Sequence, residues 1–356
     1  GTRNTAVGMN ALDANTTAND NTAVGQGASS SNTTGHSNTA VGRSSLNVNT
    51  TGSANVAVGG NALDSNTTAS NNTAVGVNSL GANTTGELNA ALGTTSLAAN
   101  TTGSSNTALG VNALFTNTTA SNNTAVGKDS LKLNTTGTAN TSIGKDSMAT
   151  NVSGSFNAAL GNNALGTSTA SNNTAVGFSA LFANTSGENN AALGRSALTA
   201  NTTASNNTAV GFESLKANTT GASNTAVGSL ALDANTTGNF NDAFGKSSLS
   251  ANTTGGSNVA IGSGTLNANT TASNNTAVGA NALNDNTTGA SNTSIGSQAL
   301  DSNTTGDFNT AIGRQALSNA TTADNNTAVG RAALSANTTG SSNVAVGANA
   351  LDANTT

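Results

Sequence analysis

A fixed repeat of 17 residues runs through this chain and constrains its fold more than any other feature. Each repeat opens with an asparagine followed by a segment such as Thr-Ala-Val-Gly, and 21 such segments begin at Asn4, Asn21, Asn38 and onward to Asn343. One step is shorter, with 16 residues from Asn157 to Asn173. A period this short indicates a repeat architecture, in which chain length measures copies rather than globular domains. We therefore expect residues 1–356 to form a single continuous array without capping repeats.

Numbered from its opening asparagine, the repeat carries apolar residues at fixed positions. Position 4 is Val, Leu, Ile or Phe in every copy, position 5 is always Gly, and position 9 is Leu except at Ser29 and Met148. Position 3 is nearly always Ala. This strict registration argues against disorder, which the abundance of Asn, Thr, Ser and Gly would otherwise suggest. The pattern predicts a narrow core made by positions 3, 4 and 9.

The polar part of the repeat favours short strands over helices. A unit of this length that contains Asn-Thr-Thr-Gly leaves too little chain for a helical pair, and Gly, Asn and Thr are poor helix residues. We expect a strand at positions 2–4, a bend at the glycine of position 5, a second strand at positions 7–10 and a return at positions 12–15. Stacked in register about 4.8 Å apart, 21 such turns predict an all-β parallel β-solenoid, with positions 4 and 9 facing each other between two thin sheets.

Asparagines recur at positions 1 and 12, and position 12 has two alternative interpretations. Stacked asparagines can bond amide to amide from turn to turn and form a ladder inside the protein. Asn-Thr-Thr is also an acceptor for N-glycosylation in nearly every repeat, as at Asn15, Asn66 and Asn354. The alternatives exclude each other, because a glycan requires an exposed side chain.

The composition argues against an enzyme. The chain has no Cys, Trp, Tyr or Pro, a single histidine and 7% charged residues. A net charge of -5 without clustered Lys or Arg argues against nucleic acid as a partner. Because no run of about 18 apolar residues occurs, we expect no membrane insertion within this segment. We assign no catalytic, cofactor-binding or metal-binding residue, and we expect no cofactor.

Residues that depart from the pattern have surface interpretations. His36 lies at the variable position 16 without a second histidine or a cysteine, which indicates a surface histidine. Charged residues are single and widely spaced, which is typical of a solvated face with local ion pairs. The aromatic residues outside the predicted core are either contacts between packed chains or adhesive contacts. Five of them are Phe156, Phe240 and Phe308, which share position 17 with Leu88, and Phe115 and Phe182 at position 10.

Three repeats carry the segment Asn-Val-Ala-Val-Gly or Asn-Val-Ala-Ile-Gly, at residues 55–59, 258–262 and 343–347. This segment resembles the Ser-Val-Ala-Ile-Gly element in the head repeats of trimeric autotransporter adhesins. The whole unit is also similar to repeats of bacterial surface proteins and of phage tail-fibre-like proteins. The resemblance implies a left-handed β-roll that assembles as a trimer, is displayed away from a cell or virion, and binds host matrix or another surface.

Together these observations favour a non-enzymatic, extracellular structural or adhesive fibre at the cell surface. Because each turn holds few large apolar side chains, we expect self-association as a trimer or a filament. Further partners would be host matrix, a cell surface or a glycan. Two alternatives stay open: a receptor-binding tail fibre of a phage or injection machine, and an ice-binding protein. The threonines at positions 13 and 14 suggest ice binding, although they lie in the predicted return rather than on a strand.

Overall fold

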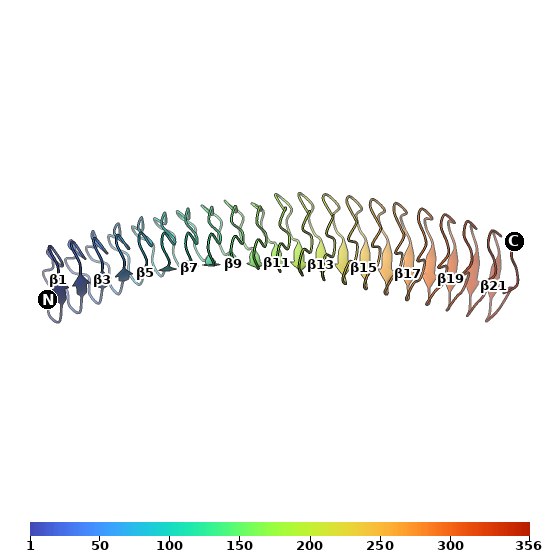
Figure 1. Ribbon diagram of the computed structural model, residues 1–356, viewed down its shortest axis with the longest axis horizontal. Coiled ribbons are helices and arrows are strands. Elements are labelled where there is room, and N and C mark those ends of the chain that lie inside the picture. Colours follow the sequence, from blue (N-terminus) through green and yellow to red (C-terminus); the bar gives the residue numbers. More distant parts are fainter. The chain divides into compact units, whose positions relative to one another are not determined.

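The computed structural model describes residues 1–356 as a parallel β-solenoid with one three-residue strand in each repeat. Its 21 parallel strands and its 17-residue spacing confirm the predicted fold class. The chain divides into two compact units, Gly1–Ala175 and Val176–Thr356. Within each unit the strands follow one another along one side of the stacked turns (Figure 1). The left-handed coil and the single continuous array stay predictions.

The strands follow the repeat, always at positions 2–4. The first unit contains β1 (Thr5–Val7), β2 (Thr22–Val24), β3 (Thr39–Val41), β4 (Val56–Val58), β5 (Thr73–Val75), β6 (Ala90–Leu92), β7 (Thr107–Leu109), β8 (Thr124–Val126), β9 (Thr141–Ile143) and β10 (Ala158–Leu160). Strand β11 (Thr174–Val176) includes the unit boundary. The second unit contains β12 (Ala191–Leu193), β13 (Thr208–Val210), β14 (Thr225–Val227), β15 (Asp242–Phe244), β16 (Val259–Ile261), β17 (Thr276–Val278), β18 (Thr293–Ile295), β19 (Thr310–Ile312), β20 (Thr327–Val329) and β21 (Val344–Val346).

Neighbouring turns pair in parallel, with the same repeat position opposite itself. Ala23 lies opposite Ala40, and the same register joins β1 to β10 and β12 to β21 step by step. Backbone bonds between turns continue outside the strands, where the amide of Leu63 donates to the carbonyl group of Ser79 at 3.1 Å. The backbone groups of one turn are therefore satisfied largely by the turns above and below it.

The core is narrow and is built from positions 3, 8 and 9. In the fourth turn these are Ala57, Ala62 and Leu63, all fully buried. Met148 replaces leucine at position 9 and is equally buried. Positions 3 and 9 agree with the prediction, whereas the inward orientation of position 8 was not predicted. Small residues at positions 3 and 8 leave room for one large side chain per turn.

The prediction that position 4 lies in the core is wrong. Its side chains point outward, and the exposed fractions of Val7, Leu92 and Phe244 are 57%, 49% and 40%. The reason is the alternation of a strand, in which successive side chains point to opposite faces. Because Ala at position 3 points inward, positions 2 and 4 must both point toward solvent.

The prediction of a second strand at positions 7–10 is also wrong. Positions 7 and 9 have left-handed backbone conformations, with φ of 55° at Asn61 and 51° at Leu63. A strand needs extended φ values, so the chain bends here instead of running straight. The left-handed conformation is costly for leucine, and burial of its side chain offsets that cost. Each turn consequently contributes to one sheet rather than two.

Two asparagines close most turns by binding one carbonyl group. The Nδ2 atoms of Asn38 and Asn49 both donate to the carbonyl oxygen of Gly52, each at 2.9 Å. Asn49 Nδ2 also donates to Asn32 Oδ1 in the preceding turn at 2.9 Å, and Asn38 Oδ1 accepts the backbone N–H of Asn55 at 2.9 Å. Position 12 thus forms the amide-to-amide ladder, and position 1 forms a side-chain-to-backbone ladder.

The buried ladder decides between the two interpretations of position 12. Asn66 is fully buried, and its Nδ2 donates to Asn49 Oδ1 at 2.9 Å and to the carbonyl oxygen of Ala69 at 3.0 Å. A glycan on this nitrogen would replace one of the two hydrogens that form these bonds and would have no space in the folded chain. Asn15 and Asn354 are only half-buried.

The short repeat at residues 157–172 keeps the positions of its apolar residues. Leu160 ends β10 at the exposed position 4, and Leu165 is fully buried at position 9. As predicted, the length change falls in the return, where the position-12 asparagine is missing. In consequence Asn151 Oδ1, in the preceding turn, is buried without a hydrogen-bond partner.

Candidate functional site

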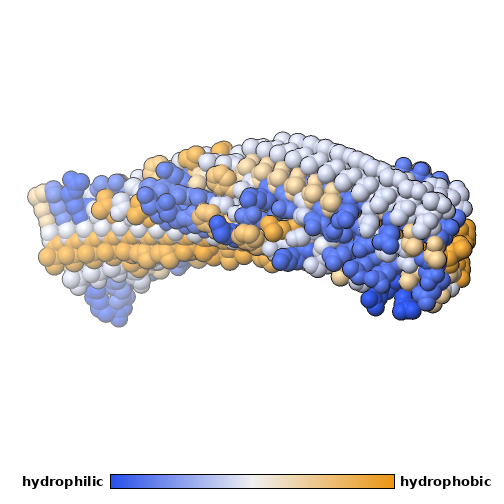
Figure 2. Space-filling view, turned by 45° about the vertical axis from the view of Figure 1, so that its right-hand side comes forward, coloured by the Kyte–Doolittle hydropathy of each residue, from blue (hydrophilic) through white to orange (hydrophobic).

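The outward side chains of positions 2 and 4 form an exposed strip over the strands, here called the strand face. In Figure 2 the apolar position-4 row of the first unit is the orange band along the left-hand part of the molecule. Position 2 is mostly threonine, and Asp242 is the single charged residue at positions 2 and 4 of the whole chain. The position-4 side chains of the first unit are Val7, Val24, Val41, Val58, Val75, Leu92, Leu109, Val126, Ile143 and Leu160.

The strand face is a long uncovered surface that is half apolar. Ten strands about 4.8 Å apart and two rows of side chains give on the order of 500 Å² in the first unit. The apolar position-4 row makes up about half of this area, and the position-2 row is mostly threonine. Ala90 replaces threonine at position 2 in β6, and a shallow groove of about 350 Å³ lies there between Val75 and Leu109. The strip therefore offers both ridges and hollows to a partner.

A second exposed surface is made by positions 6, 7, 10 and 11 and is here called the turn face. It is mainly polar, with exposed apolar side chains such as Val77 and Phe178 among the polar ones. It carries four of the five ion pairs, in agreement with the predicted solvated face with local pairs. Lys132 at position 10 lies 3.2 Å from the carboxylate of Asp129 at position 7, and Lys216 lies 3.0 Å from Glu213 in the same arrangement. These lysine side chains are about half exposed, so each pair contributes little stability, about 0–1 kcal/mol.

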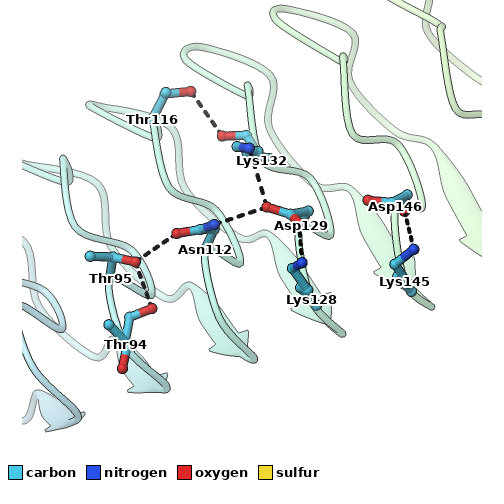
Figure 3. A network of polar contacts seen from close by, with 9 residues as sticks. All are labelled: Thr94, Thr95, Asn112, Thr116, Lys128, Asp129, Lys132, Lys145 and Asp146. Atoms are coloured by element: carbon cyan, nitrogen blue, oxygen red, sulfur yellow. Dashed lines mark hydrogen bonds and ion pairs between the residues drawn. The ribbon is translucent and has the colours of Figure 1, made fainter.

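Hydrogen bonds link the turn face across three successive turns (Figure 3). Thr95 Oγ1 donates to Asn112 Oδ1 at 2.6 Å, and Asn112 Nδ2 donates to Asp129 Oδ1 at 3.0 Å. The same carboxylate faces Lys132, and its other oxygen lies 3.7 Å from Lys128. The network ties side chains of equal repeat position together, as the ladders do inside.

The pKa values of the carboxyl groups on the turn face are shifted in opposite directions. Partial burial works to raise the pKa of Asp129, but the hydrogen bond from Asn112 and the ammonium group of Lys132 outweigh it, so this pKa is lowered. Burial raises the pKa of Asp233, and the nearby charge of Glu213 adds to that effect. Burial likewise raises the pKa of Asp301. Asp233 and Asp301 each hold one buried carboxylate oxygen without a hydrogen-bond partner.

We expect Asp233→Asn to stabilise the chain at neutral pH. A carboxyl group whose pKa is raised by folding binds its proton more tightly when folded, so its ionised form lowers stability above that pKa. The gain in melting temperature should be about 2 °C or less and should vanish as the pH falls below the ordinary value of 3.8. Thermal unfolding at a series of pH values measures it.

Asp129→Asn is the matched control with the opposite sign. Its lowered pKa means that the ionised form stabilises the fold, and this contribution is lost as the pH falls through the folded-state pKa. The variant should therefore melt below the parent protein at neutral pH and approach it in acid. A gain for both variants at neutral pH would contradict the assignment of these shifts.

The threonines of positions 13 and 14 lie on an edge of each turn. Thr33 Oγ1 at position 13 donates to the carbonyl oxygen of Thr50 in the next turn at 3.0 Å. The position-14 threonines are exposed, as at Thr220, Thr237 and Thr254. Backbone bonds such as Thr50 N–H to Thr67 carbonyl, 2.8 Å, hold the return in register. The return is therefore an ordered ladder rather than a loose loop.

The other residues that the sequence singled out lie apart on the surface. His36 is exposed, and its Nδ1 lies 3.1 Å from the carbonyl oxygen of Thr34. As predicted, the aromatic residues lie outside the core, and Phe156, Phe240 and Phe308 are each more than 60% exposed. Among the position-10 aromatics, Phe182 is exposed and Phe115 is half-buried. The structure brings none of these residues into a common site.

The sequence interpretation missed the strand face, because it placed position 4 in the core. The signal was present: a three-residue strand with alanine in its centre can bury only that alanine. It also missed a polar groove over the first three turns. The residue types that line this groove occur throughout the chain, and the groove is marked only by the small size of some of them.

The fold places the chain in the class of parallel β-solenoid repeat proteins, with an apolar strand face and a polar turn face. Comparison of the sequence with known proteins finds no matching family model and no matching curated protein. The structure contains no helix of the length and apolarity that crossing a membrane requires.

Proposed function

We propose that this protein is a non-enzymatic, extracellular structural or adhesive fibre at a cell surface, whose chains associate through the strand face. The observation that carries the proposal is the exposed strip of positions 2 and 4, in which an apolar row lies beside a row of mostly threonine and Asp242 is the single charged residue. Water contact with this strip is unfavourable, and packing it against another surface recovers about 25 cal/mol for each Å² buried.

A second copy of this chain is the partner that fits the strip best. Side chains protrude at a regular spacing of about 4.8 Å along the stack, so a partner that fills every gap needs the same spacing. Another stack of the same turns has it. The absence of charge, apart from Asp242, also removes the repulsion that two like faces would otherwise meet.

Lysine substitutions on the strand face test this association. We expect the parent chain to sediment as an oligomer at micromolar concentration and the double variant Val75→Lys with Val126→Lys to sediment as a monomer, because burying two ammonium groups in an apolar contact is costly. Analytical ultracentrifugation measures the mass. Circular dichroism should show an unchanged fold, since both side chains point to solvent.

Two valines on the turn face supply the matched control. Val77 and Val111 at position 6 are exposed, so Val77→Lys with Val111→Lys adds the same charge elsewhere. This variant should remain oligomeric. A monomeric parent chain, or equal dissociation of both double variants, would refute the strand face as the contact.

Ice binding is a second candidate, favoured by the exposed row of position-14 threonines. Positions 13 and 14 carry no charged residue in any repeat, and the backbone bonds between turns hold the row in register. Thermal hysteresis in a freezing assay that is lost on substitution of Thr237 by lysine would support it. A receptor-binding fibre of a phage or injection machine would share the same stack and would be distinguished by its attachment to a tail.

A further inference from the structure

A polar groove of about 560 Å³ lies on the turn face of the first three turns. The second turn departs there from the repeat, with Gly27 at position 7, Ser29 at position 9, and Ser30 and Ser31 at positions 10 and 11. At position 10, Ser30 lies between the larger Asp13 and Asn47 of the first and third turns, and at position 7 Gly27 has no side chain. The hollow is therefore a property of the sequence at this place and not of the repeat.

The floor of the groove is fixed and open. Ser30 Oγ donates to Asn47 Oδ1 at 2.5 Å, which holds both side chains in place. A methyl group added to Gly27 would meet no atom nearer than the Asn47 Oδ1 at 3.7 Å. The groove thus offers hydroxyl and amide groups along its floor and free space directly above Gly27.

Opposite charges stand at the two ends of the groove. Asp13 belongs to the first turn and Arg43 to the third, so about 10 Å separates their places along the stack. Neither belongs to an ion pair of the chain, and both residues are exposed. The guanidinium group of Arg43 is therefore available to an external anion.

We propose that this groove binds a short acidic saccharide. Its carboxylate would lie on the Arg43 guanidinium, whose planar fork donates two parallel hydrogen bonds to a carboxylate. Sugar hydroxyls would donate to the Asp13 carboxylate and exchange hydrogen bonds with Ser30 and the amide of Gln26. The proposal gives the adhesive role a ligand and therefore rests on the proposed function.

The chemistry of the groove disfavours other ligand classes. A peptide would need apolar pockets for its side chains, and none of the groove residues is a large apolar side chain. A nucleic acid would need several basic groups to neutralise its phosphates, and the groove holds Arg43 alone beside the carboxylate of Asp13. A hydroxyl-rich ligand with one negative charge matches both ends.

Titration with two matched disaccharides tests the proposal, and nuclear magnetic resonance or calorimetry measures the affinity. The probes are glucuronic acid linked to N-acetylglucosamine, and N,N′-diacetylchitobiose, which lacks the carboxylate. We expect the acidic probe to bind about ten-fold more tightly than the neutral one, and Arg43→Gln to remove that difference. Equal affinities for the two probes in the parent chain, or no binding of either, would overturn the proposal.

Two further variants separate the groove from general surface charge. Gly27→Asn should abolish binding by filling the hollow, and it should fold normally because asparagine occupies position 7 with similar φ at Asn61. Arg314→Gln removes another position-6 arginine and should leave binding unchanged. If Arg314→Gln weakens binding as much as Arg43→Gln does, the groove is not the site. Sedimentation of the same variants reports self-association independently, so failure of the groove and failure of the fibre are distinguishable.

Discussion

Gly59→Ala should open the stack between its fourth and fifth turns and should be among the most damaging single substitutions in the chain. The position-5 glycines have φ between 128° and 143°, a region that is essentially restricted to glycine. A Cβ atom on Gly59 would lie 2.5 Å from the carbonyl oxygen of Gly76. Strain and collision together should cost about 3–5 kcal/mol.

The adjacent glycine provides the control for this prediction. Gly60 has no atom within 4 Å of an added Cβ atom, so Gly60→Ala should change the free energy of unfolding by less than about 0.5 kcal/mol. Denaturant titration compares the two variants. Hydrogen exchange should show the loss of protection confined to the turns around Gly59, because each turn of a solenoid contacts only its neighbours. Similar losses for both variants would contradict the backbone argument.

The second large effect is expected from Asn218→Ala in the position-12 ladder. Asn218 Nδ2 donates to Asn201 Oδ1 at 3.0 Å and to the Gly221 carbonyl oxygen at 2.9 Å, and its Oδ1 accepts from Asn235 Nδ2 at 2.9 Å. The substitution leaves Asn201 Oδ1 buried without a donor. One orphaned acceptor and two lost bonds should together cost about 2–4 kcal/mol, measured by denaturant titration.

The nineteenth turn naturally lacks the position-12 asparagine, so the ladder can be restored there by a substitution. Ala320 occupies position 12 there and is fully buried, and the preceding Asn303 Oδ1 has no hydrogen-bond partner. Ala320→Asn should supply the missing donor and stabilise the second unit by about 1 kcal/mol or more. Asparagine fits beside an alanine at position 15 elsewhere, as Asn66 does beside Ala69. If the ladder does not contribute to stability, Asn218→Ala and Ala320→Asn will both have the free energy of unfolding of the parent chain.

The sequence predicted those parts of the fold that depend on one residue type stacked on itself. Glycine recurs at position 5, leucine at position 9 and asparagine at position 12. Each recurs because its position has the same backbone conformation and the same neighbours in successive turns. The bend and the buried leucine were therefore predicted, whereas the amide ladder was one of two alternatives that the sequence left open for position 12. Position 4 was misplaced because apolar character was taken as a sign of burial, whereas strand alternation orients the side chain.

Other features depend on conformations and spaces that residue identity does not reveal. Leucine seldom adopts positive φ, so nothing in the sequence indicated that Leu63 bends the chain where a second strand was expected. The polar groove arises because Gly27 has no side chain and Ser30 has a shorter one than the residues at position 10 of the turns on either side. Such a hollow becomes visible only when three turns are stacked in register.

The asparagine ladder also gives each unit a direction. Seven consecutive amide bonds run from Asn151 back to Asn32 in the first unit, and seven run from Asn303 back to Asn184 in the second. In every bond the nitrogen points toward the preceding turn, so the amide dipoles align and polarise one another. Each run is thus a cooperative block with unlike ends, and two stacks lying side by side are energetically different when they run parallel and when they run antiparallel.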